Sequence, residues 1–278
     1  MKAAMFGAGQ GGNVLINLIV SDYEFVACFD NNPEKWGSAI SGLTVQSPDQ
    51  LLEIQPEIIW TGTLNDDAAN EIEKQIRGLG FMGSIKHAKD LKNRYDIRLA
   101  ELRLIAKTIE FRKIVGVIAE LGVYQGNFAR ELNRNFPDRK LYLFDTFEGF
   151  QPEDIAKERG LSKAGKGDFS DTSEDFIREN LAYPSQVVIL KGRFPETIPK
   201  EEIKYSLVSL DADLYEPTRQ GLGYFYPRLS SGGVLLIHDY NSRQFPGVKK
   251  AVDEYLNDQN LFLIPICDFH GTAILMKP

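Results

Sequence analysis

The stretch Ala119-Glu-Leu-Gly-Val-Tyr-Gln-Gly126 decides the fold of most of this 278-residue chain. It begins inside a short apolar run at 116–121 that reads as a buried parallel strand. Glycines just past such a strand allow the backbone to turn and to approach a ligand closely. Ligands of α/β sheets bind at the carboxyl ends of the strands. We therefore expect a binding site where this strand ends.

Three more polar motifs follow apolar runs further along the chain. They are Leu141-Tyr-Leu-Phe-Asp145, Ser209-Leu-Asp-Ala-Asp213 and His238-Asp-Tyr240. An acid that ends the strand after a glycine turn can accept hydrogen bonds from ribose hydroxyls. The two later acidic clusters would face the same crevice. This order of motifs is typical of a metal-assisted enzyme that uses a nucleoside cofactor.

Strand-like runs alternate with helical patterns over 114–278, which we take as one domain. This alternation predicts a doubly wound α/β sheet, and two final runs with a short spacer predict a terminal antiparallel hairpin. The expected strands cover 116–121, 140–144, 187–190, 207–210, 233–237, 261–266 and 272–276. Residues 150–170 show little periodicity and predict either a lid over the crevice or a surface loop.

Residues 1–85 predict a small, separate Rossmann-like unit. Gly7-Ala-Gly-Gln-Gly-Gly12 matches G-x-G-x-x-G between an expected strand and an expected helix. Asp30 follows a second expected strand, so Gly7, Gly9, Gly12 and Asp30 could hold a nucleotide or sugar nucleotide. A role in packing or recognition stays open, because a complete dinucleotide site needs two such halves.

The segment 86–113 is charged and has helical periodicity. Its apolar positions Leu99, Leu102, Ile105 and Ile109 recur on one face, which predicts a connecting helix between the two domains.

Composition narrows the class of protein. The net charge of -7, with no basic run longer than Lys249-Lys250, argues against a nucleic-acid partner. No apolar stretch is long enough for a membrane span. Cys28 and Cys267 lie in apolar runs and are expected to be buried free thiols. Together these features predict a cytoplasmic protein.

Five motifs carry a specific resemblance over residues 100–278: the glycine stretch at 119–126, Leu143-Phe-Asp-Thr-Phe-Glu-Gly149, Lys191-Gly-Arg-Phe-Pro-Glu-Thr197, Leu210-Asp-Ala-Asp-Leu-Tyr-Glu216 and His238-Asp-Tyr240. In order and spacing they resemble the macrocin O-methyltransferase-like family, which methylates sugar hydroxyls in macrolide and aminocoumarin biosynthesis. The first domain lies outside that resemblance and is similar to sugar-nucleotide-binding domains of bacterial sugar-modifying enzymes.

The resemblance implies S-adenosylmethionine as the cofactor and a divalent metal, Mg²⁺ or Mn²⁺. It implies a metal site of Asp211, His238 and Asp239, with Asp211 and His238 as catalytic residues. The implied cofactor-binding residues are Glu120, Gly122, Tyr124, Gly126, Asp145, Thr146, Arg193 and Phe194. Asp213 and Glu216 could instead cap a helix that begins near Pro217, and His87 and His270 receive no role.

One position departs from the family, because related members carry Asp-Asp-Tyr where this chain has His238-Asp-Tyr240. Mg²⁺ prefers oxygen ligands, whereas imidazole suits borderline metals. Two interpretations stay open. Either a metal such as Mn²⁺ takes His238 as a ligand, or Mg²⁺ stays on Asp211 and Asp239 with His238 as a nearby base.

We therefore predict a metal-assisted O-methyltransferase that acts on a sugar hydroxyl of a glycoside, a nucleotide sugar or a polysaccharide precursor. Its partner would be a small-molecule or glycan acceptor, and a homodimer is allowed. One alternative is an NAD-dependent sugar-nucleotide oxidoreductase or epimerase, although the chain contains no Tyr-x-x-x-Lys dyad. Another is a non-catalytic nucleotide-binding scaffold, which the presence of Asp211 and Asp239 disfavours.

Overall fold

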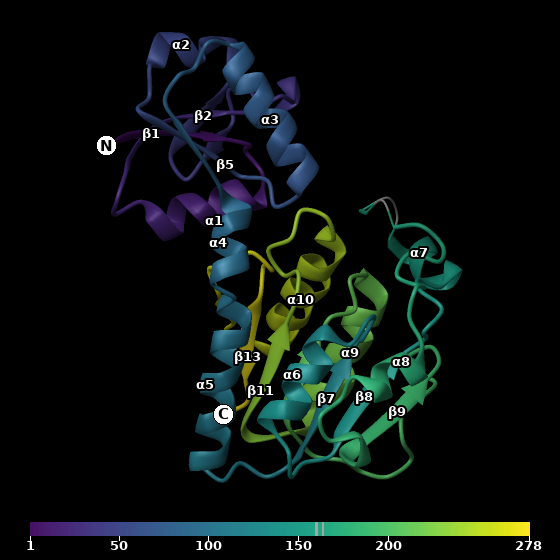
Figure 1. Cartoon of the computed structure of the whole chain (residues 1–278). Coiled ribbons are helices and arrows are strands. Elements are labelled where there is room, and N and C mark those ends of the chain that lie inside the picture. Colours follow the sequence, from purple (N-terminus) through teal and green to yellow (C-terminus); the bar gives the residue numbers. More distant parts are fainter. Residues whose placement is uncertain (159–160, 163) are drawn as a thin grey trace. The chain divides into compact units, whose positions relative to one another are not determined.

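The computed structural model describes residues 1–158, 161–162 and 164–278. The described chain divides into two compact units, each with its own sheet (Figure 1). The first unit is Met1–Ile97 with Cys267–Phe269, and the second is Arg98–Ile266 with His270–Pro278. Within the described residues, no helix combines the length and apolar content needed to cross a membrane.

The first unit is built on a six-stranded sheet in the order β3-β4-β2-β1-β5-β6. All its pairings are parallel except the short β3–β4 pair, as expected for a Rossmann-like unit. The strands are β1 (Lys2–Phe6), β2 (Glu24–Phe29), β3 (Ala39–Ile40), β4 (Leu43–Gln46), β5 (Ile58–Thr61) and β6 (Ser84–His87).

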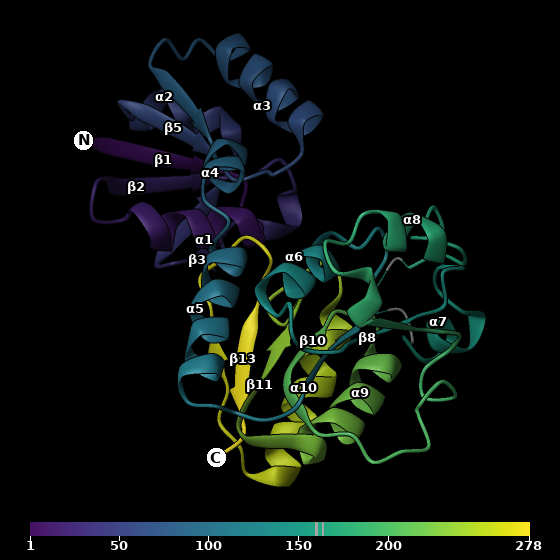
Figure 2. The same ribbon diagram turned by 60° about the horizontal axis from the view of Figure 1, so that its bottom comes forward.

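Helices cover both faces of this sheet, as Figure 2 shows. One buried cluster joins the sheet to α1 (Gln10–Ile19) and α4 (Ala88–Arg94). A second cluster, on the other face, joins it to α2 (Leu51–Ile54) and α3 (Asp66–Gly78). Two 3-10 turns, Pro33–Lys35 and Pro48–Gln50, complete the unit. Both begin with proline, which suits the first turn of a helix because its missing N–H would be unpaired there.

The second unit contains a seven-stranded sheet in the order β12-β13-β11-β10-β7-β8-β9. Five neighbouring strands are parallel, and β13 and β12 close the sheet as an antiparallel hairpin, which confirms the predicted fold class. The strands are β7 (Val117–Leu121), β8 (Leu141–Asp145), β9 (Val187–Lys191), β10 (Tyr205–Leu210), β11 (Leu229–Ile237), β12 (Ile264–Pro265) and β13 (Ala273–Met276).

Strand order places a crevice in this sheet. The chain runs outward from β7 through β8 to β9, then returns to form β10 and β11 on the other side of β7. The connections after β7 and β10 therefore diverge to opposite faces. Open α/β sheets bind their ligands at such a point, outside the carboxyl ends of the strands.

Helices again form two layers. One core cluster packs α5 (Ile97–Phe111), α6 (Asn127–Asn135) and α8 (Glu174–Glu179) on one face of the sheet. The other packs α9 (Tyr215–Arg228) and α10 (Pro246–Gln259) on the opposite face. The short α7 (Pro152–Glu158) lies beside α9. The sheet between these layers is buried, which explains the continuous apolar runs of its strands.

The expected single helix over 86–113 is wrong. Strand β6 extends to His87, and the helical region is split into α4 and α5 because Tyr95 adopts an extended backbone. The edge strand β6 is only partly buried, so it lacks the apolar run that marks the other strands. Apolar periodicity in α5 is real, since Leu102, Ile105 and Ile109 are buried.

Three smaller expectations also need correction. Part of the aperiodic stretch 150–170 forms α7, whose Pro152, Glu153 and Asp154 are start signals too brief to show a period; residues 159–160 and 163 of this stretch lie outside the described residues. Only Ile264–Pro265 of the expected strand 261–266 forms a strand, β12, which lies at the edge of the sheet, where proline is tolerated. Cys28 is a buried free thiol, but Cys267 is exposed.

The glycines of the first unit allow α1 to pack on the ends of β1 and β5. A Cβ on Gly12 would lie 2.1 Å from the carbonyl oxygen of Gly7, and one on Gly11 would lie 2.1 Å from that of Gly62. Gly9 is different, because a Cβ there meets nothing within 4 Å. Close packing therefore explains Gly12 without any ligand, whereas nothing in the packing requires Gly9.

We predict that Gly12→Ala lowers the free energy of unfolding by about 1–3 kcal/mol, the usual cost of overpacking. Gly9→Ser is the matched control, because serine is a good N-cap and space is open there. It should change stability by less than about 0.5 kcal/mol. Chemical denaturation of the whole protein measures both. Equal losses in the two variants would contradict this packing role.

Candidate functional site

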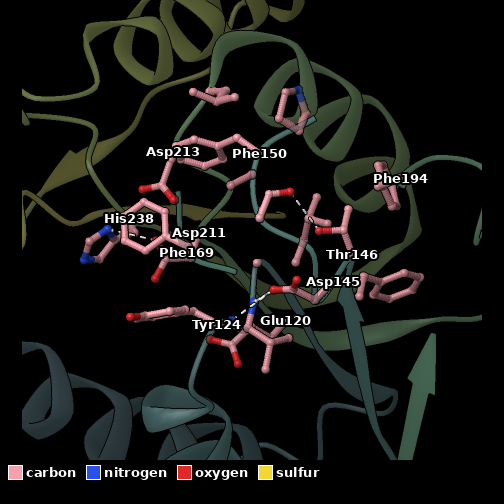
Figure 3. Close-up of a pocket in the computed structure, with 18 of the residues that line it drawn as sticks. Glu120, Tyr124, Asp145, Thr146, Phe150, Phe169, Phe194, Asp211, Asp213 and His238 are labelled. Carbon is pink, nitrogen blue, oxygen red and sulfur yellow. Dashed lines mark hydrogen bonds and ion pairs between the residues drawn. The ribbon is translucent and has the colours of Figure 1, made fainter. Parts of the chain in front are cut away.

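A cavity of about 520 Å³ opens at the carboxyl ends of β7, β8, β10 and β11 in the second unit. This size is typical of small-molecule sites. Figure 3 shows its two groups of polar side chains. Asp211, Asp213 and His238 gather on one side, and Asp145 and Thr146 lie on the other.

The glycine turn after β7 passes directly beside the end of β10. Gly122 has a φ of +85°, and a Cβ there would fall 1.8 Å from the carbonyl oxygen of Asp211. The Asp211 N–H in turn donates to the Leu121 carbonyl at 2.8 Å. Glycine is therefore required at position 122 both for its conformation and for space. This contact ties the turn to Asp211.

Asp145, the last residue of β8, holds the same turn from the other side. Its Oδ2 accepts the backbone N–H groups of Val123 at 2.6 Å and Tyr124 at 2.9 Å, and its Oδ1 accepts that of Phe147 at 2.7 Å. Each carboxylate oxygen can accept more than one bond. The orientation of Asp145 is thus fixed while it keeps acceptor capacity for a ligand hydroxyl.

Glu120 lies on the cavity wall with one oxygen unpaired. The residue is 1% exposed, and its Oε1 accepts from the Ser209 hydroxyl at 3.3 Å. Its Oε2 has no hydrogen-bond partner among the described residues. Burial and the charge of Asp211 raise the pKa of Glu120 well above its ordinary value. A buried orphan oxygen at a cavity wall fits a ligand that brings a donor, such as an ammonium group.

The other expected cofactor residues also border the cavity, except Gly126, which N-caps α6 with a φ of +70°. Tyr124 packs edge-on against Phe169, with ring centroids 5.1 Å apart. The Thr146 hydroxyl donates to the Gly149 carbonyl at 3.0 Å.

Arg193 and Phe194 are both held by the protein. Arg193 donates to Asp154 through two nitrogens, at 2.6 and 3.1 Å. This bidentate pair raises the pKa of Arg193. The Phe194 ring is buried and stacks on Phe225 at 5.7 Å, so only part of it borders the cavity. Figure 3 shows Phe194 at the far side from His238.

The acidic motifs after β10 and β11 form one cluster. Asp211, Asp213, His238 and Asp239 each offer a ligand atom, and these atoms all lie within 4.8 Å of one another. The His238 Nδ1 lies 3.0 Å from Asp211 Oδ1 and 2.7 Å from Asp239 Oδ2. Three carboxylates and an imidazole within reach of one point fit a divalent cation.

The cluster has strongly perturbed pKa values. Burial acts to raise the pKa of Asp211, but the charges of His238 and Arg98 outweigh it and hold this pKa below its usual range. Burial together with Asp211 and Asp239 raises the pKa of Asp213 well above normal. Burial lowers the pKa of His238, but the charge of Asp211 outweighs this and raises it to about 10. A cluster of this kind favours an added positive charge.

Four residues other than glycine that border the cavity have a left-handed backbone. Tyr124, Phe169, Asp213 and Asp239 all line it and have φ values of +48° to +64°. Positive φ is costly for residues other than glycine and is found most often at functional sites. The strained positions include two residues of the acidic cluster.

Sequence reasoning missed three sets of residues. Arg98 lies in no motif and is 113 positions from Asp211, so only the fold brings the two together. The His270 Nδ1 lies 3.5 Å from the His238 Nε2, because the terminal hairpin returns to β11. Asp213 also belongs to the cluster; the sequence places it in the same acidic motif as Asp211 but does not mark it as a metal ligand. Aromatic side chains also line the cavity: Phe150, Phe169 and Phe245.

In the first unit, the expected residues meet at the ends of β1 and β2. Asp30 accepts from the Ala8 N–H at 2.7 Å, the Asn32 N–H at 2.9 Å and Lys35 Nζ at 2.8 Å. Burial acts to raise the pKa of Asp30, but these bonds, led by that of Lys35, lower it below its usual value. Asp30 is thus paired within the chain, and Gly9 is the member of the motif with open space around it.

Three curated relatives are similar to this chain. Demethyldecarbamoylnovobiocin O-methyltransferase of Streptomyces niveus is 29% identical over 57% of this chain and 64% of its own length. An O-methyltransferase of Streptomyces olivaceus that acts on a rhamnosyl-tetracenomycin is 28% identical over 65% of this chain and 72% of its own. Mycinamicin III 3''-O-methyltransferase of Micromonospora griseorubida is 29% identical over 51% and 61%. The matched region therefore spans less than two thirds of two of these relatives.

Solved structures show the same fold. The O-methyltransferase NovP aligns with a TM-score of 0.52 at 26% identity and covers 65% of this chain and 79% of its own. The calicheamicin methyltransferase CalS11 aligns with a TM-score of 0.55 at 19% identity over 76% and 86%. Structural neighbours therefore place the second sheet among methyltransferase folds.

Family matches cover both units separately. Residues 1–84 match the family described as C2185-like, N-terminal. Residues 94–277, which include every motif of the cavity, match the family described as Macrocin-O-methyltransferase (TylF). The chain therefore belongs to the macrocin O-methyltransferase family.

Proposed function

We propose that this protein transfers a methyl group from S-adenosylmethionine to a sugar hydroxyl, with the help of a divalent cation. One observation carries the proposal: cofactor-type groups and a metal-type cluster share one cavity, and the Gly122–Asp211 contact joins them. The family membership and the sugar-modifying relatives support it.

The cofactor would be held at both ends by residues of this chain. Asp145 would accept the ribose hydroxyls, and the unpaired Oε2 of Glu120 would accept from the ammonium group of the methionine part. Arg193 and Phe194 would border the adenine. The sulfonium of the bound cofactor supplies both the methyl group and its leaving group. The chain must therefore mainly align the acceptor oxygen with the methyl carbon.

Asp211, His238 and Asp239 would hold the metal, with Asp213 beside them. A divalent cation lowers the pKa of a hydroxyl that contacts it and orients that hydroxyl. The acceptor proton would pass to Asp211, or to His238 once the charge of the cation has offset the carboxylate charge that raises the pKa of His238. Asp211 Oδ1 and His238 Nδ1 lie 3.0 Å apart, so a proton taken by one is within reach of the other. Whether His238 is a ligand or a base is decided by the metal experiment below.

The acceptor would be a glycoside, a nucleotide sugar or a polysaccharide precursor, because the curated relatives modify sugars of natural products. The open space at Gly9 leaves a nucleotide or sugar nucleotide as the proposed ligand of the first unit. A cytoplasmic location, a homodimer and the exclusion of nucleic acids remain predictions.

The cofactor prediction uses S-adenosylhomocysteine as the probe. It should bind the wild-type protein in calorimetry and raise its melting temperature. Asp145→Asn should weaken binding by about 1.5–3 kcal/mol, because a charge-assisted bond to the ribose is lost. Asp258→Asn, on the exposed end of α10, is the control and should bind normally. If the wild-type protein does not bind S-adenosylhomocysteine, the proposed enzyme is wrong.

The metal prediction uses chelation and substitution. Methyl transfer should collapse in EDTA and in Asp211→Asn or Asp239→Asn, while S-adenosylhomocysteine binding persists, because these side chains would hold the metal and not the cofactor. His238→Asp separates the two interpretations of His238. A ligand role predicts that the aspartate variant keeps activity and shifts its preference from Mn²⁺ toward Mg²⁺, whereas a base role predicts loss with either ion. Undiminished transfer in chelator would remove the metal from the mechanism.

The acceptor class is tested with the whole protein and a panel of free glycosides, nucleotide sugars and oligosaccharides. Mass spectrometry should find one added methyl group in at least one class. It should also find S-adenosylhomocysteine in equal amount. Release of S-adenosylhomocysteine only with non-sugar acceptors would overturn the proposed substrate class.

A further inference from the structure

Arg98 is a buried cation beneath the acidic cluster, outside every motif of the family resemblance. It is the second residue of α5, and its side chain is 7% exposed. Its guanidinium carbon lies 3.8 Å from the centre of the Phe128 ring, on α6. This stacked position fixes the plane of the guanidinium. Burying a charge costs free energy unless the charge is paired. The groups that pair with Arg98 therefore indicate what its side chain does.

The partners of Arg98 are the metal-side acid and a serine. Its Nη2 lies 3.2 Å from Asp211 Oδ2 and 3.3 Å from the Ser209 hydroxyl. That serine donates to Glu120 Oε1, the acid on the cofactor side. The Nη2 of Arg98 therefore contacts Asp211 directly and Glu120 through Ser209. The Nε of Arg98 has no hydrogen-bond partner among the described residues. Hydrogen bonding to the surrounding protein therefore does not fully explain why a guanidinium is buried here.

The two oxygens of Asp211 have separate neighbours. Oδ2 faces Arg98, whereas Oδ1 faces His238 Nδ1 at 3.0 Å. A carboxylate held in this way presents Oδ1 toward the rest of the acidic cluster. Without Arg98 it could rotate or bind through both oxygens. A small rotation matters, because a misplacement of about 1 Å can cost a reaction about 100-fold in rate.

We propose that Arg98 is a positioning residue that holds Asp211 in one orientation, so that a single oxygen faces the metal and the acceptor hydroxyl. This inference rests on the proposed function. Arg98 borders the cavity, but in this role it acts on the reaction through Asp211 and moves no proton itself. The positive charge of Arg98 lowers the affinity of the acidic cluster for a metal ion. The same residue keeps Asp211 in the orientation that methyl transfer needs.

The test compares Arg98→Met with wild-type protein. We expect kcat to fall about 10- to 100-fold, with little change in the KM of the acceptor. Mn²⁺ binding, followed by electron paramagnetic resonance, should become at least about threefold tighter, because a neighbouring positive charge is gone. The S-adenosylhomocysteine affinity should change much less than kcat, because Ser209 still donates to Glu120 in the variant. A merely structural residue would not improve metal binding while it slows transfer.

Two more variants sharpen the result. Arg98→Lys keeps the charge but loses the planar stacked group, so it should not restore kcat. Arg103→Met is the matched control, because Arg103 lies on the same helix, is 55% exposed and pairs only loosely with Glu131 at 3.4 Å. It should behave as wild type in every assay. If Arg98→Met does not fold, as judged by its melting curve, Arg98→Gln takes its place.

Three outcomes would overturn the proposal: unchanged kcat in Arg98→Met, full recovery in Arg98→Lys, or Mn²⁺ binding that is unchanged or weaker in folded Arg98→Met. The Mn²⁺ titration needs no acceptor. If the wild-type protein binds Mn²⁺ and S-adenosylhomocysteine but methylates no sugar, the proposed function fails. The titration would then still decide whether Arg98 constrains Asp211.

Discussion

The close approach of β7 and β10 at Gly122 is the constraint on which the site depends. No side chain fits between the glycine turn and the Asp211 carbonyl, where a Cβ would lie 1.8 Å from the oxygen. The turn that would receive the cofactor and the acid that would hold the metal are thus parts of one rigid junction. Asp145 secures the turn from the other side through two backbone N–H groups. Alignment of methyl donor and acceptor then follows from the sheet itself.

Electrostatics sets a second condition on this junction. Burial and the charges of neighbouring acids disfavour the charged forms of Glu120 and Asp213, which both line the cavity. His238 and Arg98 supply the positive charges that keep Asp211 ionised. The two cations act on different oxygens of Asp211, so they fix its orientation as well as its charge. A divalent cation would add further positive charge to the cluster. The positive charges of His238 and Arg98 would repel it and so lower its affinity.

Much of the fold could be predicted from local patterns. Buried parallel strands appear as short apolar runs, and the residues after each run are delivered to one edge of the sheet. The five parallel strands of the second sheet lie within a few residues of their expected positions for this reason, among them β7 (Val117–Leu121) and β8 (Leu141–Asp145). The edge strand β6, half exposed, and the seven-residue α7 were missed because neither is long or apolar enough to show a period.

The sequence by itself determined the two α/β units, the glycine turn at 122–126 and the acids at 145, 211 and 239, because each follows a strand and needs no distant partner to be recognised. Only the tertiary structure decided which groups surround them. Arg98 reaches Asp211 across 113 positions, and His270 reaches His238 across 32, through helix packing and hairpin return that leave no local signature. The contact of Gly122 with Asp211 is likewise a property of strand order. The local motifs therefore identify the reactive side chains, and the packing between the motifs determines how those side chains are oriented.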